Sequence, residues 1–209
     1  MQALLLDFNG TLSDDEPVLC DIFMDLFAEE GKPLTEKEYY AELAGLADPE
    51  IVERWLGEPR PDLIQRKIDA YRKEVESGWT IHITTVMALQ QAAERVSIAV
   101  VSGSAREEIE PVLRAAHLID SIAVIVSADD VAHGKPNPEG YGRALHALRL
   151  DPRGCVAVED SDVGVTAAKA AGLYCVAVTT TMSAERLSEA DELAERFDPD
   201  LIARLVSPS

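Results

Sequence analysis

Cysteine is scarce in this sequence, and no apolar run is long. The three cysteines, Cys20, Cys155 and Cys175, show no CxxC spacing, which favours buried thiols in a reducing compartment over a disulfide or a metal site. No apolar run approaches the ~20 residues that cross a bilayer. Residues 1–6 are too short for the apolar region of a signal peptide. We therefore expect a cytoplasmic protein that has no membrane partner.

Basic residues are also few: 19 Lys and Arg stand against 38 Asp and Glu, which gives a formal net charge of −19. Such a charge repels a phosphate backbone and an anionic lipid surface alike, so we expect no nucleic-acid partner. An anionic substrate would need a local cation. The content of 47% hydrophobic and 27% charged residues is typical of a globular protein, and 209 residues suffice for one α/β core with an insertion or for two small domains.

Five short apolar runs predict buried strands. Because these runs are continuous rather than alternating, they indicate a parallel sheet that is covered on both faces. Segments with helical spacing separate the last four runs, so strand and helix alternate. This order predicts a doubly wound, Rossmann-like parallel α/β sheet, whose ligands bind outside the carboxyl ends of the strands. The predicted strands are 3–7, 97–102, 122–126, 155–160 and 174–178.

The long stretch between the first two predicted strands shows helical spacing and almost no strand signal. Gly31 and Pro33 mark the end of its first helix. Because the stretch is too long for a loop, we interpret residues 14–80 as an inserted α-helical cap domain, here named the cap segment. Residues 1–13 and 81–209 then form the α/β core. The predicted helices are 17–30, 35–44, 49–56 and 62–77 in the cap segment and 84–94 in the core.

Four of the predicted strands end in, or lead into, residues that are capable of chemistry. The carboxyl ends of parallel strands meet at one edge of a sheet, so we expect these side chains to share one crevice. This coincidence is more informative than any single residue. The residues are Asp7, Asn9, Gly10 and Thr11 after the first strand, Ser102, Gly103 and Ser104 after the second, Lys135 after the third, and Glu159, Asp160 and Ser161 at the fourth.

Four short motifs at these strand ends resemble those of a known enzyme family. DFNGTL, VVSGSA, GKPNPEGY and VEDSDVGV, in this order and spacing, are similar to the four motifs of the haloacid dehalogenase superfamily of phosphohydrolases. The helical insertion directly after the first motif resembles the cap of its β-phosphoglucomutase-like branch. The likeness covers nearly the whole chain. It implies a phosphatase that acts on a small phosphorylated metabolite.

The resemblance implies that Asp7 is a nucleophile whose carboxylate attacks phosphorus and forms an aspartyl-phosphate, which divides one difficult transfer into two easier ones. Lys135 would neutralise the transferring phosphoryl group and the charge of Asp7. Each residue also has a simpler interpretation. A carboxylate at a strand end can cap a turn, and a lysine before a proline can be a solvated loop residue.

Phosphate binding would fall to residues of the first two motifs. Gly10 and Thr11 would let the backbone turn tightly, so that amide groups face phosphate oxygens. Ser102 would hydrogen-bond a phosphate oxygen, helped by the amide of Gly103 at the start of the next helix. The alternative for the serines is a helix cap, because Ser102 or Ser104 could satisfy free amides there.

The resemblance also implies a Mg²⁺ ion, held by Asp7, Glu159, Asp160 and the backbone carbonyl of Asn9. Hard oxygen ligands and a phosphate partner suit this ion, which reduces repulsion between an anionic nucleophile and an anionic substrate. Of the two late acids we favour Asp160 as the direct ligand. The alternative is that Glu159 and Asp160 are acidic caps of a helix over 163–172.

Asn9 departs from the family pattern, because most phosphatases of this family have a second Asp at this position as the general acid and base. An amide cannot exchange a proton at neutral pH, and acid–base catalysis is typically worth ~10²- to 10⁴-fold in rate. Another acid could act instead, with Asp14, Asp15 or Glu16 as candidates, although each can simply be an acid at a helix start. Alternatively, the protein is a catalytically weakened phosphate-ligand binding or regulatory protein.

The cap segment also departs from the pattern of this branch of the family. Ala44 and Asp48 stand where the mutases of this branch carry a Lys and an Arg that grip sugar phosphate, which argues against mutase activity. Carbon–phosphorus or carbon–halogen hydrolysis on the same scaffold is a further alternative, although the metal acids argue against a dehalogenase. We expect a monomer or weak dimer. The remaining cations of the cap segment are predicted to be solvated: Lys37, Arg54, Arg60 and Lys67.

Overall fold

The computed structural model describes residues 1–207, and over this range the chain forms one parallel sheet of six strands in the order β3-β2-β1-β4-β5-β6. All five predicted strands are present, which confirms the doubly wound α/β class. The sixth strand was not predicted, because its three residues, Glu-Leu-Ala, are too few to form a continuous apolar run. The strands are β1 (Ala3–Leu6), β2 (Ser97–Val101), β3 (Val124–Val126), β4 (Cys155–Glu159), β5 (Tyr174–Val178) and β6 (Glu192–Ala194).

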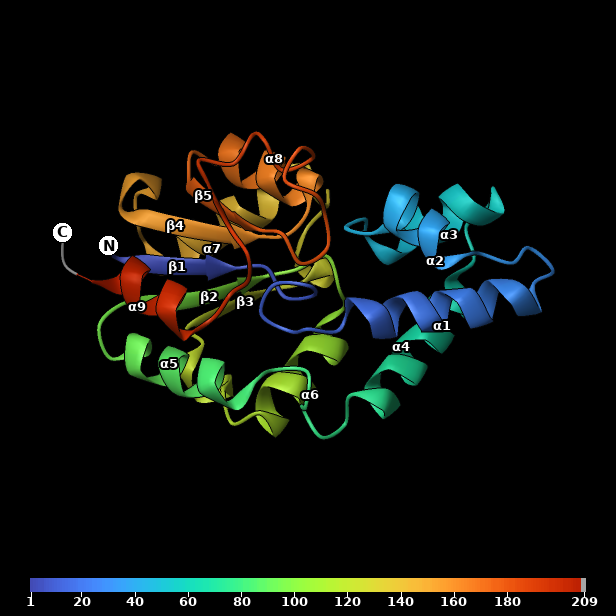
Figure 1. The fold of residues 1–209 in the computed structure, drawn as a ribbon, viewed down its shortest axis with the longest axis horizontal. Coiled ribbons are helices and arrows are strands. Elements are labelled where there is room, and N and C mark those ends of the chain that lie inside the picture. The colour runs from blue at the N-terminus through green and yellow to red at the C-terminus, as the bar shows by residue number, and fades with distance from the viewer. Residues whose placement is uncertain (208–209) are drawn as a thin grey trace.

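Alternate residues of each central strand pack on opposite faces of the sheet. In β1, Leu4 and Leu6 belong to one buried cluster, whereas Ala3 and Leu5 belong to the other. Helices α5 (Ile83–Ala93), α6 (Arg106–Ala115) and α9 (Pro199–Val206) cover one face, and α7 (Glu139–Leu148) and α8 (Asp162–Ala170) cover the other (Figure 1). A sheet buried on both faces explains why its strands read as continuous apolar runs.

The cap segment holds four α-helices, which lie beyond the carboxyl ends of the strands (Figure 1). The predicted helix over 35–44 is divided, because a π-helical stretch, η1, follows the short α2. The left-handed conformation of Gly31 (φ 74°) directly follows the first helix, as its sequence predicts. The elements are α1 (Glu16–Glu29), α2 (Glu36–Glu38), η1 (Tyr39–Leu43), α3 (Asp48–Leu56) and α4 (Pro61–Glu74).

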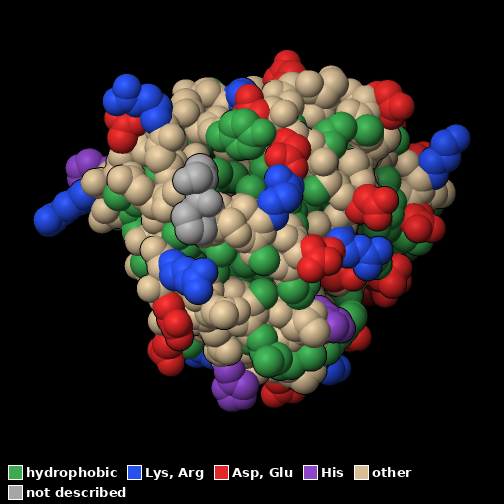
Figure 2. Space-filling model, turned by 60° about the vertical axis from the view of Figure 1, so that its left-hand side comes forward, with side chains coloured by type: hydrophobic (Ala, Val, Ile, Leu, Met, Phe, Trp, Pro, Cys, Tyr) green, Lys and Arg blue, Asp and Glu red, His purple; other side chains and the backbone are tan. Residues whose placement is uncertain are grey.

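Figure 2 shows one face, on which acidic and basic side chains are interspersed. Within residues 1–207, no helix combines the length and the apolar character that a membrane span requires. The three cysteines are buried and unpaired, as predicted.

Candidate active site

A small cavity lies at the carboxyl ends of β1, β2 and β4, beside the point where the strand order reverses. Its volume is about 60 Å³, which is enough for a few water molecules. The fold therefore brings together side chains that are far apart in the sequence, at the position where doubly wound sheets bind ligands. Six predicted site residues line the cavity: Asp7, Asn9, Ser102, Gly103, Lys135 and Asp160.

Lys135 links the end of β1 to the end of β4. Its ammonium group lies 2.5 Å from Oδ1 of Asp7 and 2.6 Å from Oε1 of Glu159. Burial lowers the pKa of Lys135, but the charges of the two carboxylates outweigh this effect and raise it above its usual value. The interpretation of Lys135 as a solvated loop residue is therefore wrong.

Glu159 and Asp160 take different positions at the end of β4. Oε1 of Glu159 accepts hydrogen bonds from Lys135 and from the hydroxyl group of Tyr141 at 2.5 Å, whereas Asp160 lines the cavity. Burial raises the pKa of both carboxyl groups. Neither residue caps α8, because Ser161 is the N-cap and accepts from the amide of Gly164.

One carboxylate oxygen from each of Asp7, Glu159 and Asp160 lies within 4.8 Å of the other two. This buried set of hard oxygen donors fits a divalent cation such as Mg²⁺. Two glycines make room for the set. A Cβ atom on Gly10, whose φ is 71°, would collide with the carboxylate of Asp160, and one on Gly164 would collide with that of Glu159.

Asn9 is held by hydrogen bonds on both sides of its amide. Its Nδ2 donates to Oδ2 of Asp15 at 3.0 Å, and its Oδ1 accepts from the hydroxyl group of Ser104 at 2.7 Å. Asp15 also accepts from Tyr71 and from the amide of Gly10. Burial raises the pKa of Asp15 to about 6, although these hydrogen bonds lower it. Asp15 occupies the N-cap position of α1 but makes no capping hydrogen bond.

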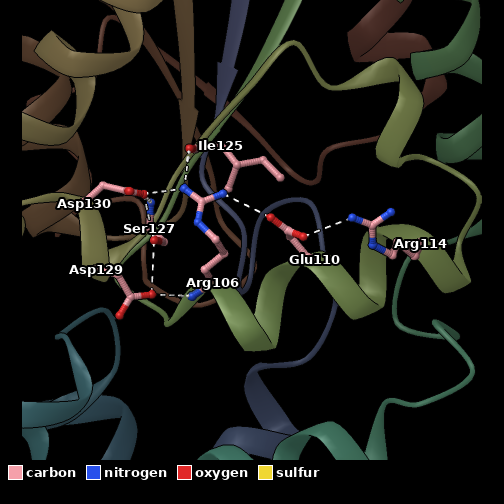
Figure 3. Close-up of polar contacts among 7 residues, drawn as sticks. All are labelled: Arg106, Glu110, Arg114, Ile125, Ser127, Asp129 and Asp130. Carbon is pink, nitrogen blue, oxygen red and sulfur yellow. Dashed lines mark hydrogen bonds and ion pairs between the residues drawn. The ribbon is translucent and has the colours of Figure 1, made fainter.

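The loops that follow β2 and β3 are tied together by Arg106 (Figure 3). Its guanidinium group donates to the backbone oxygen of Ile125 at 3.0 Å and to Asp130 at 2.6 Å, while its backbone amide donates to Asp129. Asp130 in turn accepts from the backbone and side chain of Ser127. This network braces the loops that carry Ser102 and Lys135.

The expectation that α6 starts close to Gly103 needs correction. The helix begins at Arg106 with Ala105 as its N-cap, and the side chain of Glu108 accepts from the Ala105 amide. The alternative that Ser102 or Ser104 caps this helix is therefore wrong. Ser102 accepts instead from the amide of Ser104 at 3.1 Å.

Gly10 and Thr11 do not line the cavity that Asp7 shares with Lys135. Both border a separate, larger depression together with Trp79 and Thr180. The amide of Gly10 donates within its own turn, to the backbone oxygen of Ser13 at 2.8 Å. At the site, Gly10 leaves space for the carboxylate of Asp160.

Lys67 is not solvated, so that prediction is wrong. Its ammonium group is buried between Asp48 at 3.0 Å and Glu108 at 2.7 Å, and it therefore links α4 and α3 of the cap segment to α6 of the core. Asp48 also lines the cavity. The other three cations of the cap segment, Lys37, Arg54 and Arg60, are exposed or partly exposed.

Two cavity residues were not predicted to act together. Glu16, at the start of α1, accepts a hydrogen bond at 2.9 Å from the hydroxyl group of Tyr39, the first residue of η1. Both line the cavity. No role at the site was predicted for Tyr141, although its place in the GKPNPEGY motif could have indicated its contact with Glu159.

The sheet order and the polar cavity define a Rossmann-like α/β protein with a site at its strand ends. A model of the haloacid dehalogenase-like hydrolases matches residues 4–178, and the chain belongs to that family.

Similar proteins of this family carry names of phosphatases. Validoxylamine A 7'-phosphate phosphatase of Streptomyces hygroscopicus subsp. limoneus is 32% identical over 197 residues, which cover 92% of each chain. Phosphoglycolate phosphatase of Nitrosospira multiformis is 30% identical and covers 84% of this chain and 83% of its own. The crystal structure of an Asp-to-Asn variant of CbbY from Rhodobacter sphaeroides, in complex with xylulose-1,5-bisphosphate, has a TM-score of 0.83 at 29% identity and covers 94% of this chain and 95% of its own.

Proposed function

We propose that this protein is a magnesium-dependent phosphatase that hydrolyses a small phosphorylated metabolite through an aspartyl-phosphate on Asp7. The observation that carries the proposal is the meeting of Asp7, Lys135 and the late acidic pair in one buried site. The phosphatase names of similar proteins support it. A protein with this large negative charge offers a phosphate few other places to bind.

The chemistry follows from the positions of these side chains. The carboxylate of Asp7 attacks phosphorus, and Lys135 beside it balances the negative charge of the nucleophile and the phosphoryl group. The hydroxyl group of Ser102 is placed to donate to a phosphate oxygen. A Mg²⁺ ion held by Asp7, Asp160 and the backbone carbonyl of Asn9 would supply further charge neutralisation. Glu159 orients Lys135, so we favour Asp160 as the direct ligand.

We also propose that residues 14–80 act as a cap over a core of 1–13 and 81–209. Residues of the cap segment and of the core line the same narrow cavity, so we expect the cap segment to move away from the strand ends to admit substrate and to exclude water on its return. The buried contact of Lys67 with Glu108 marks the closed arrangement.

Phosphate release from a panel of compounds tests the proposal. The panel contains p-nitrophenyl phosphate, acetyl phosphate, hexitol phosphates and phosphoglycolate, each assayed with Mg²⁺ and with a chelator. We expect Mg²⁺-dependent release that Asp7→Asn abolishes. The matched control is Asp25→Asn, an exposed change on α1 that should leave release unaltered. Absence of release from every compound would contradict the proposal.

Asn9 favours a second candidate function, a phosphate-ligand binding or regulatory protein with weakened catalysis. Tight Mg²⁺-dependent binding of a panel compound without turnover, both in the unaltered protein and in a variant with an acid restored at position 9, would support this candidate over the first.

A further inference from the structure

Asn9 leaves the proposed phosphatase without an obvious proton donor for the leaving group. Its amide nitrogen and oxygen are already engaged with Asp15 and Ser104. In an in-line transfer to Asp7, the leaving oxygen lies on the side of phosphorus that is opposite to Asp7. The helices of the cap segment lie beyond the strand ends (Figure 1), and residues of this segment line the cavity. A replacement acid can therefore reach the leaving oxygen from the cap segment as well as from position 9.

Three acids follow Asn9 closely in the sequence, and the structure separates them. Asp14 is exposed and borders the depression near Trp79 rather than the cavity. Both oxygens of Asp15 accept hydrogen bonds from its neighbours, and Asp15 does not line the cavity. Glu16 does line it.

One oxygen of Glu16 is held and the other faces no partner. Oε1 accepts from Tyr39 at 2.9 Å, and no hydrogen bond to Oε2 is formed by any of residues 1–207. We propose that Glu16 is the general acid and base of this site, in the place of the carboxyl group that Asn9 lacks, and that Tyr39 is its positioning residue. The assignment rests on the proposed phosphatase function.

The proton and electron pairs balance in both halves of the reaction. An oxygen of Asp7 bonds to phosphorus while the bond to the leaving oxygen breaks, and that oxygen takes the electron pair and the proton of Glu16. A water molecule then attacks the phosphorus, and its proton returns to Glu16 as the bond to the oxygen of Asp7 breaks. The products are an alcohol and inorganic phosphate, and Glu16 is neutral again.

The surroundings of Glu16 suit both steps. Burial raises its pKa to about 7, the charge of Asp15 adds to this effect, and the hydrogen bond from Tyr39 opposes it. An acid whose pKa lies near the working pH is best able to give and take a proton. The titratable or charged groups whose electrostatic effects couple to Glu16, or that share its cavity, are Asp15, Tyr39, Asp7, Lys67, Cys20, Tyr40, Asp48, Lys135 and Asp160.

The test compares two leaving groups in the full-length protein with Mg²⁺. Benzyl phosphate releases an alkoxide that needs a proton, whereas p-nitrophenyl phosphate releases a phenolate that does not. We expect Glu16→Gln to lower kcat/KM for benzyl phosphate by ~10²- to 10⁴-fold and for p-nitrophenyl phosphate by less than ~10-fold. Gln can still accept from Tyr39, so the fold should persist, and Asp25→Asn serves as the control on the same helix.

A second readout separates catalysis from binding. Because hydrolysis of the aspartyl-phosphate also needs the base, Glu16→Gln should release a burst of about one p-nitrophenol per protein molecule and then turn over slowly. In the unaltered protein, the ratio of kcat/KM for benzyl to p-nitrophenyl phosphate should fall as the pH rises through about 7. Tyr39→Phe removes a hydrogen bond that lowers this pKa, so the fall should move to higher pH.

Three outcomes would overturn the assignment: an equal loss for both compounds, no loss for either, or a pH-independent ratio in the unaltered protein. The double change Asn9→Asp with Asp15→Asn should restore benzyl phosphate hydrolysis to Glu16→Gln, because it places a carboxyl group at position 9. No phosphate release from either compound by the unaltered protein would overturn the proposed function, and this assignment with it.

Discussion

The hydrogen bond between Asn9 and Asp15 predicts that an acid cannot simply be restored at position 9. In Asn9→Asp, a carboxylate oxygen replaces the Nδ2 that donates to Asp15 over 3.0 Å. A hydrogen bond to a charged group is worth roughly 1.5–3 kcal/mol. Two carboxylates at this separation repel by roughly 5 kcal/mol at an effective dielectric constant of about 20. The pair will therefore retain a proton rather than ionise twice.

The cost of this change should depend on pH. Burial already raises the pKa of Asp15 to about 6, and a second carboxyl group raises the pKa of the pair further. A raised pKa means that the folded state holds a proton that the unfolded chain has lost, so stability falls as the pH rises through the folded pKa. We expect Asn9→Asp to lower the free energy of unfolding by about 2–4 kcal/mol at pH 8 and by clearly less at pH 5.

Exchanging the two groups should remove most of this cost. In Asn9→Asp with Asp15→Asn, the amide at position 15 donates to the new carboxylate, and the hydroxyl group of Tyr71 can turn to accept. Urea unfolding at pH 5 and pH 8 measures the three proteins. The control is Asn137→Asp, at the only other Asn of the chain, which is exposed. The reasoning fails if Asn9→Asp is as stable as the unaltered protein at pH 8, or if the exchange is no more stable than the single change.

Three further changes test the other charges. Lys135→Met should lower kcat/KM for p-nitrophenyl phosphate by ~10²- to 10³-fold, and retained activity would contradict its role beside Asp7. Mg²⁺ at a hundredfold excess over its Kd should stabilise the folded protein by ~3 kcal/mol, which thermal unfolding detects as a higher melting temperature. Asp160→Asn should abolish this rise, and an undiminished rise would place the metal elsewhere. Lys67→Met leaves buried carboxylates unpaired and should cost ~3–5 kcal/mol in urea unfolding, whereas Lys73→Met, an exposed change on the same helix, should cost little.

The α/β core could be predicted because its signals are local. Each buried strand is a continuous apolar run, and each run ends in a polar residue or Gly where the chain leaves the sheet. The parallel arrangement then requires Asp7, Ser102 and Asp160 to share one edge. The sixth strand, Glu192–Ala194, carries no such signal and was missed. Its pairing with β5 depends on the neighbouring strand, not on its own sequence.

The partners of charged groups could not be predicted, since they lie far away in the sequence. Lys67 and Glu108 are 41 residues apart, and Glu16 and Tyr39 are 23 apart. A lysine in a polar helix reads as solvated, and only the packing of α4 against α6 buries it. For the same reason Asp15 reads as an acid at a helix start, although it holds Asn9.

The sequence by itself therefore determined the class of fold, the edge of the sheet that carries the chemistry and the identity of the residues there, because apolar periodicity and strand ends are written in neighbouring positions. Only the tertiary structure decided which carboxyl groups are buried, which are paired with Lys135 or Lys67, and which faces the cavity. Burial and pairing set the protonation of an acid, and both depend on contacts that close over long separations along the chain.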